Sequence, residues 1–148
     1  TGYATHTTTA TAQPALSVVS VSTGDDPTET ITQYRLATTD GVSTAMATIT
    51  IPQNTTVGIE CHVTSRRTGG SSGTAQDAAD YRINVAMKGN TGTASEIAAE
   101  TLTVFGEDQA AWTVTAAPST NTEIISVTGA TNNNVTWHAT CRTWAVGS

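Results

Sequence analysis

The chain has 148 residues, a net charge of −6, and six Lys and Arg residues that form no basic run. So few cations argue against a nucleic-acid partner, which needs a clustered positive face. No apolar run reaches the ~20 residues of a membrane-spanning helix, so we expect no membrane insertion. The length suits a single domain with its own hydrophobic core.

Thr is the commonest residue, and the chain is poor in the Lys and Glu residues that favour helices. Because Thr is β-branched, it fits a pleated sheet better than a helix. No segment has the period of a long amphipathic helix. The composition therefore predicts an almost purely β protein.

The N-terminal segment, residues 1–15, is rich in Thr and Ala and has no clear periodicity. We expect it to be an extended arm or tether. Alternating apolar and polar residues then predict a series of short strands separated by turn signals. These strands cover residues 16–22, 30–36, 45–51, 57–66, 81–88, 102–104, 112–116, 124–128 and 135–144, and residues 94–99 fit either a helical turn or a strand end.

A succession of about eight or nine short strands is typical of an all-β sandwich or barrel. We expect one antiparallel β-sandwich, jelly-roll-like, over residues 16–148. In the strand at 45–51, the alternation places Ala45 and Ala47 inward and Met46 outward. The residues expected to anchor the core are Ile59, Tyr81, Ile83, Trp112 and Trp137.

Two cysteines, Cys61 and Cys141, fall on the expected inward faces of their strands. Either they meet in the core, where they can form a disulfide, or they are two separate buried thiols that act as small hydrophobes. A disulfide would persist only outside a reducing cytosol.

Candidate catalytic residues are few. Outward-facing His62 and His138 could bind a metal with Glu60 if their strands are neighbours, but two solvated or interface imidazoles are the commoner arrangement. The acidic pairs at 25–26 and 107–108 could bind calcium, although turn-forming roles are far commoner. No nucleophile elbow or phosphate-binding loop is present. We therefore predict no enzyme, no cofactor and no metal.

Trp144 lies on the outward parity near the C-terminus, either as a strand-edge cap or as an interface anchor. With His62, His138, Arg66 and Arg67 it completes our set of candidate interface residues. Since loops on a rigid scaffold often carry binding, the loops at 68–76, 106–110 and 129–134 are candidates to face a receptor or a partner subunit.

Six segments together resemble a β-sandwich domain that recurs in virion proteins of tailed bacteriophages, namely tail fibres, head fibres, decoration proteins and adhesins. They are TITIP at 48–52, GIECHVTSRR at 58–67, ADYRI at 79–83, EDQAAWTV at 107–114, ISVTGA at 125–130 and VTWHAT at 135–140. The similarity covers about residues 42–146. The cysteines depart from it, since Val or a similar residue is expected there, and this favours a Cys61–Cys141 contact.

The resemblance implies a structural or host-attachment role on the virion, often as a trimer, with no catalytic residues to carry over. The expected partners are further copies of the chain, other virion subunits, and a glycan or protein of the host surface. One alternative is a subunit of a bacterial or archaeal extracellular filament or adhesin, in which the N-terminal arm adds a strand to the next subunit. A second is a carbohydrate-binding module that uses Tyr3, Tyr34 and Trp144 as outward aromatics.

Overall fold

The computed structural model describes residues 17–21 and 28–147, with side-chain positions from residue 28 onward. All its regular elements are strands. Their bounds are β1 (Ser17–Val21), β2 (Thr28–Thr38), β3 (Thr44–Thr50), β4 (Thr55–Gly70), β5 (Ala78–Asn90), β6 (Thr93–Glu107), β7 (Thr113–Ser119), β8 (Thr122–Thr128) and β9 (Asn133–Gly147). Among these residues there is no helix that could span a membrane. The expected N-terminal arm lies outside the described residues.

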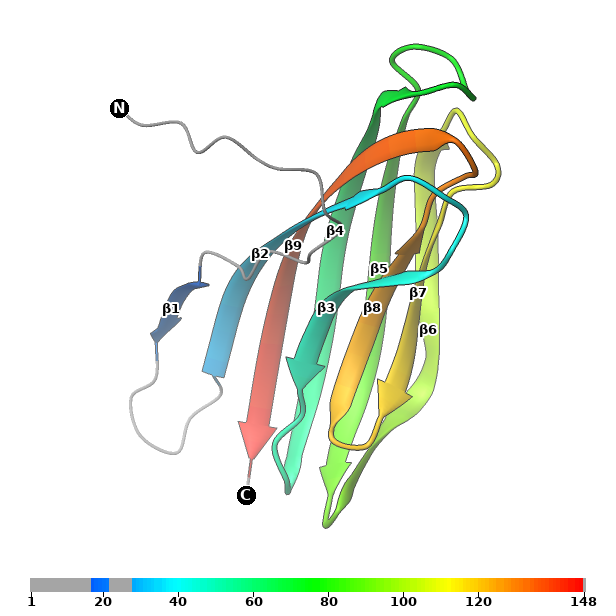
Figure 1. Cartoon of the computed structure of the whole chain (residues 1–148). Coiled ribbons are helices and arrows are strands. Elements are labelled where there is room, and N and C mark those ends of the chain that lie inside the picture. The colour runs from blue at the N-terminus through cyan, green and yellow to red at the C-terminus, as the bar shows by residue number, and fades with distance from the viewer. Residues whose placement is uncertain (1–16, 22–27, 148) are drawn as a thin grey trace.

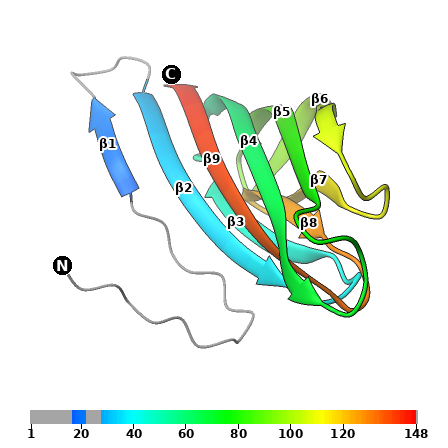
Figure 2. The ribbon, with the colours of Figure 1, turned by 90° about the horizontal axis from the view of Figure 1, so that it is seen from above.

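The strands form two antiparallel sheets, which confirms the predicted β-sandwich (Figure 1). The large sheet has six strands in the order β1-β2-β9-β4-β5-β6, and the small sheet has three in the order β3-β8-β7. Figure 2 shows the large sheet curving around the small one. Their facing sides enclose the core.

The connections are partly those of a jelly roll. The chain changes sheet between β2 and β3 and again between β8 and β9, while β2 pairs with β9 and β3 pairs with β8. Each sheet therefore pairs an early strand of the chain with a late one, as in a jelly roll. In contrast, β4, β5 and β6 stay in the large sheet as a meander.

Large aromatic side chains fill the centre of the core. Tyr81 and Trp137 stack with their ring centroids 6.5 Å apart, and Trp112 meets Trp137 edge-on at 5.9 Å. The indole Nε1 of Trp137 donates a hydrogen bond of 2.9 Å to the Thr38 hydroxyl. Because a buried indole N–H needs an acceptor, this bond fixes the orientation of the ring. All five expected anchors, Ile59 included, are buried.

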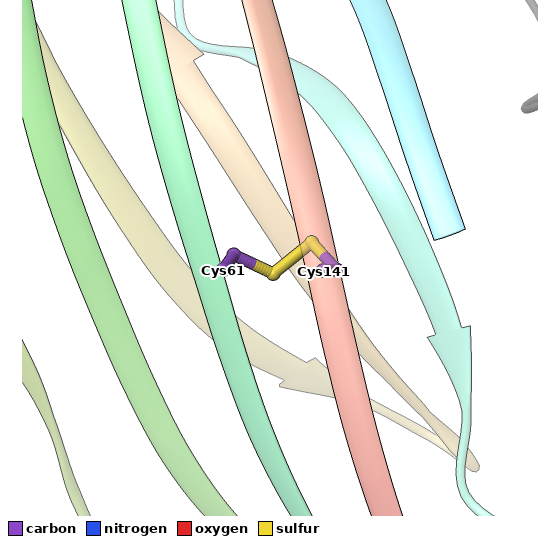
Figure 3. The surroundings of a disulfide bond; sticks show 2 residues. All are labelled: Cys61 and Cys141. Carbon is purple, nitrogen blue, oxygen red and sulfur yellow. A yellow bond between two sulfur atoms is a disulfide. The ribbon is translucent and has the colours of Figure 1, made fainter. Parts of the chain in front are cut away.

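A disulfide joins Cys61 of β4 to Cys141 of β9 (Figure 3). The two residues are direct cross-strand partners, with their Cα atoms 4.0 Å apart, and both side chains are buried. The bond spans 80 residues of sequence and connects neighbouring central strands of the large sheet. A structural disulfide is typical of proteins that work outside the reducing cytosol.

The structure corrects two local predictions and decides between the two alternatives for residues 94–99. A register shift between Ala45 and Ala47 turns Met46 into the core and exposes Ala45, so the simple alternation in this strand was wrong. Residues 94–99 belong to β6 rather than to a helical turn. β4 continues through Gly70, because it keeps pairing with β9 into the predicted loop.

Candidate functional site

Glu60, His62 and His138, considered for a metal site, lie on the outer face of the large sheet, whereas the acidic pair at 25–26, considered for calcium, lies outside the described residues. His62 Nε2 lies 2.6 Å from Asp80 Oδ1, a neighbour that the sequence did not suggest. His138 lies on the adjacent strand β9, where its cross-strand partner is Thr64 of β4 and not His62. Among the described residues, no three His, Cys, Asp or Glu side chains gather as metal ligands. The structure thus places both imidazoles on one face without joining them in a site.

Phe105 of β6 is the centre of an aromatic patch on this outer face. Its ring is about half exposed, with the Arg82 guanidinium 5.3 Å from the ring centroid and the His62 ring 6.2 Å away, edge-on. The pairing of β5 with β6 shifts register beside it, between Asp80 and Tyr81. Because of this irregularity, the alternation in the sequence does not predict that the Phe105 ring is exposed.

Trp144 of β9 forms a second aromatic patch on the same face. Its side chain lies over Gly58, and the Arg142 guanidinium is 5.8 Å from its ring centroid. Arg142 Nε also pairs with Glu29 Oε1 at 3.0 Å. Trp144 is 41% exposed, so the ring remains available to a partner.

The three loops predicted to face a partner gather at one end of the sandwich (Figure 1). Hydrogen bonds connect these loops. Ser72 N donates to Asn132 O at 3.0 Å, and Gln109 Nε2 donates at 2.7 Å to Oδ2 of Asp77, the residue that follows the first loop. Arg67, a candidate interface residue, instead holds its own loop through the carbonyls of Gly70 and Ser72. Arg66 is exposed and remains available for an interface.

Glu123 is a buried carboxyl group that sequence reasoning missed. Glu123 of β8 is fully buried between the sheets, and neither of its carboxylate oxygens has a hydrogen-bond partner in the described part of the protein. Burial, reinforced by the charges of Glu96 and Glu100, raises the pKa of Glu123 to about 7. Since Glu123 has no exposed surface, a substrate cannot reach its carboxyl group.

Tyr81 carries a second buried polar group. Its hydroxyl donates to Glu107 Oε2 at 2.9 Å and lies 3.3 Å from the Trp112 carbonyl oxygen. Burial raises the pKa of this hydroxyl far above its usual value, and the Glu107 carboxylate adds to the shift. Tyr81 therefore stays neutral and ties β5 to the end of β6.

Strand β6 carries most of the exposed large apolar side chains among the described residues, on both faces of the sheet. It lies at one edge of the large sheet and pairs only with β5. Four of the seven exposed large hydrophobic side chains belong to it: Ile97, Leu102, Val104 and Phe105. The sequence predicted Leu102 and Val104 as strand residues, but their exposure depends on which strand ends at the sheet edge.

A cleft of about 240 Å³ opens at the other side of the sandwich, between β2 and β3. Inward side chains of β2 line it, among them Thr32 and Tyr34. Tyr34 therefore faces inward, half-buried against the core, and our expectation of an outward aromatic at this position was wrong. Tyr3, the other aromatic of that hypothesis, lies outside the described residues.

Comparisons with known proteins give a distant structural similarity and no match in sequence. No protein-family model and no curated protein matches the chain. Among solved structures, the fold is similar to part of tailspike protein gp49 from Acinetobacter baumannii bacteriophage Fri1, a capsular polysaccharide depolymerase. The TM-score is 0.43 at 12% identity, over 84% of this chain and 19% of that one. The chain thus spans about a fifth of that protein's length, and we draw nothing about function from this likeness.

Proposed function

We propose that this chain is a non-enzymatic structural component of a tailed-bacteriophage virion, a fibre, decoration or attachment domain that assembles with itself. The apolar edge strand β6 is the observation that carries this proposal. Native monomers protect their sheet edges with charges, proline or bulges, because a free edge is a template for another chain. Strand β6 has three register shifts against β5 and carries three Glu residues, yet four large apolar side chains stay exposed along its 15 residues.

Three further features support the virion role. The six sequence segments resemble phage virion domains, and the disulfide suits a protein outside the cytosol. The chain also has the antiparallel sandwich that this resemblance implies. We expect a homotrimer in contact with capsid or tail subunits.

For a glycan or protein of the host surface, we propose the outer face of the large sheet as the contact. Its two exposed rings, Phe105 and Trp144, each lie beside an Arg guanidinium. Aromatic and Arg side chains are enriched at binding hot spots, because they combine apolar area with hydrogen bonding.

The self-assembly is tested by replacing Leu102 and Val104 together with Lys. We expect the wild-type protein to be multimeric by light scattering and the L102K/V104K variant to have a lower mass, because two charges cannot be buried unpaired in a subunit contact. Thr103→Lys on the same strand is the matched control, and it should leave the mass unchanged. A wild-type monomer at all concentrations would contradict the proposal.

A second candidate is a subunit of an extracellular filament or adhesin that is assembled by strand addition. It is favoured by the open edge of β3 and the cleft beside it. Electron microscopy of the purified protein separates the two functions. Long filaments support this candidate, and discrete particles support the virion component.

A further inference from the structure

The cleft between β2 and β3 has two different kinds of wall. On β2 it is lined by alternate residues, Thr30, Thr32 and Tyr34, which share the inward face of the strand. On β3 it is lined by three consecutive residues, 48–50. Because successive side chains of a strand point to opposite faces, three consecutive residues can line a cleft only along the edge of the strand. The cleft therefore runs along the free edge of β3.

That position is where a fourth strand of the small sheet would lie. Past β9 the large sheet continues with β2 and β1, whereas the small sheet stops at β3. Adjacent strands of a sheet lie about 4.8 Å apart, so one added strand beside β3 would cover the inward face of β2. The missing strand explains why Thr30, Thr32 and Tyr34 are only half-buried, although Leu36 further along the same face is fully covered.

The lining of the cleft is polar but uncharged. Hydroxyl groups of Thr and Tyr dominate it, and β9 adds Thr143 and the disulfide-bonded Cys141. Burial raises the pKa of Tyr34, so its hydroxyl stays neutral. The volume of about 240 Å³ is below the ~300–1,000 Å³ of small-molecule pockets, and it suits a few small side chains of a strand.

The N-terminal part of the chain has the composition that such a strand needs. Residues 1–24 contain no Asp, Glu, Lys or Arg, so nothing in this part places a full charge between the sheets. Apart from His6, residues 4–12, ATHTTTATA, are small, and most of them are the β-branched Thr, which suits both a strand and a hydroxyl-lined cleft.

We propose that the cleft along β3 is an acceptor site for residues 4–12 of a second copy of this chain, which pair with β3 as a fourth strand. The occupant binds through main-chain hydrogen bonds to the edge and through small inward side chains in the cleft. This inference rests on the self-assembly in the proposed function. It adds a contact at β3, separate from the one proposed at β6, through which one copy holds the next.

Mixed disulfide formation between two variants of the full chain, each with one added cysteine beside the native disulfide, tests this contact. One partner carries Thr50→Cys at the cleft, and the other carries Thr7→Cys, Thr8→Cys or Thr9→Cys in the N-terminal segment. We expect a cross-linked dimer on non-reducing gels, with about tenfold more product than when the acceptor is Thr103→Cys on β6, because docking raises the local thiol concentration. Non-reducing mass spectrometry identifies the joined peptides.

A matched pair of charge substitutions tests the acceptor site independently. Thr32→Glu places a carboxylate in the cleft and should abolish the cross-link, whereas Gln33→Glu on the outer face of the same strand should preserve it. Circular dichroism establishes that both variants are folded.

The other outcomes are distinguishable. Absence of cross-linking in a protein that is multimeric by light scattering overturns the acceptor site and leaves the proposed assembly standing. A double variant of one chain, Thr8→Cys with Thr50→Cys, that closes only within monomers also overturns it, because the segment then fills its own cleft. A monomer without any cross-link overturns both proposals.

Discussion

At the scale of single residues, Glu123 is the side chain whose position most needs explanation. It lies in the middle of the small sheet, between Ile49 of β3 and Pro118 of β7, and points into the core without a hydrogen-bond partner. A buried unpaired carboxylate is costly, so the group keeps its proton up to about pH 7. In the unfolded chain it loses the proton near its ordinary pKa of 4.5.

Glu123→Gln should therefore make stability less dependent on pH. Between about pH 5 and pH 7 the unfolded chain ionises Glu123 while the folded protein does not, so the free energy of unfolding falls as the pH rises and stays low above pH 7. The difference is on the order of 3 kcal/mol. Urea unfolding at pH 5 and pH 8 should show this loss in the wild type and a much smaller one in E123Q. Glu60→Gln, on the outer face, is the control and should behave as the wild type.

At the scale of elements, the disulfide connects two strands that are far apart in sequence. Cys61 of β4 and Cys141 of β9 are separated by 80 residues. Linking them restricts the unfolded chain much more than it restricts the folded sheet, where the two strands already pair along most of their length. The bond therefore acts mainly as a stabiliser of the large sheet.

Replacing both cysteines with Ala should lower the free energy of unfolding by about 4 kcal/mol, because a loop of this length gains considerable entropy when it is opened. Guanidinium unfolding of the double variant measures the loss. Wild-type protein kept reduced during unfolding should reproduce most of it, which separates the cross-link from the packing of the sulfur atoms. Equal midpoints for the variant and the oxidised wild type would refute the assignment.

At the scale of the whole molecule, the last strand in sequence is central in space. β9 lies between β2 and β4 and pairs with both along most of its length. In contrast, β1 lies at an edge and pairs only with β2. The two ends of the chain thus contribute very differently to the large sheet.

A chain that ends at residue 132 should fail to fold, because removing β9 separates β2 from β4 and also removes Trp137 from the core. A chain that starts at residue 28 should remain folded, since it loses only the edge strand β1 and the segments before and after it. One-dimensional proton NMR distinguishes these results by the dispersion of the methyl signals. A well-dispersed spectrum from the chain without β9 would contradict this account of the sheet.

The alternation of apolar and polar residues in the sequence was sufficient to predict much of the fold. The period-two pattern around Ile59, Ile83 and Trp137 placed the core residues correctly, because one face of each central strand is buried and the other is solvated. The pattern failed at Met46 and gave no prediction for Phe105, and at both residues a register shift breaks the period. A shift of this kind depends on how the partner strand is paired, which a single strand cannot reveal.

The sequence by itself determined that the chain is β, where most strands run, and that both cysteines face the core. Only the tertiary structure decided that the cysteines are cross-strand partners, that Tyr34 faces a cleft, that Glu123 is buried, and that β3 and β6 end their sheets. These facts depend on strand order. A strand carries the same alternation at an edge and at the centre of a sheet, and only packing against its neighbours decides what it leaves exposed.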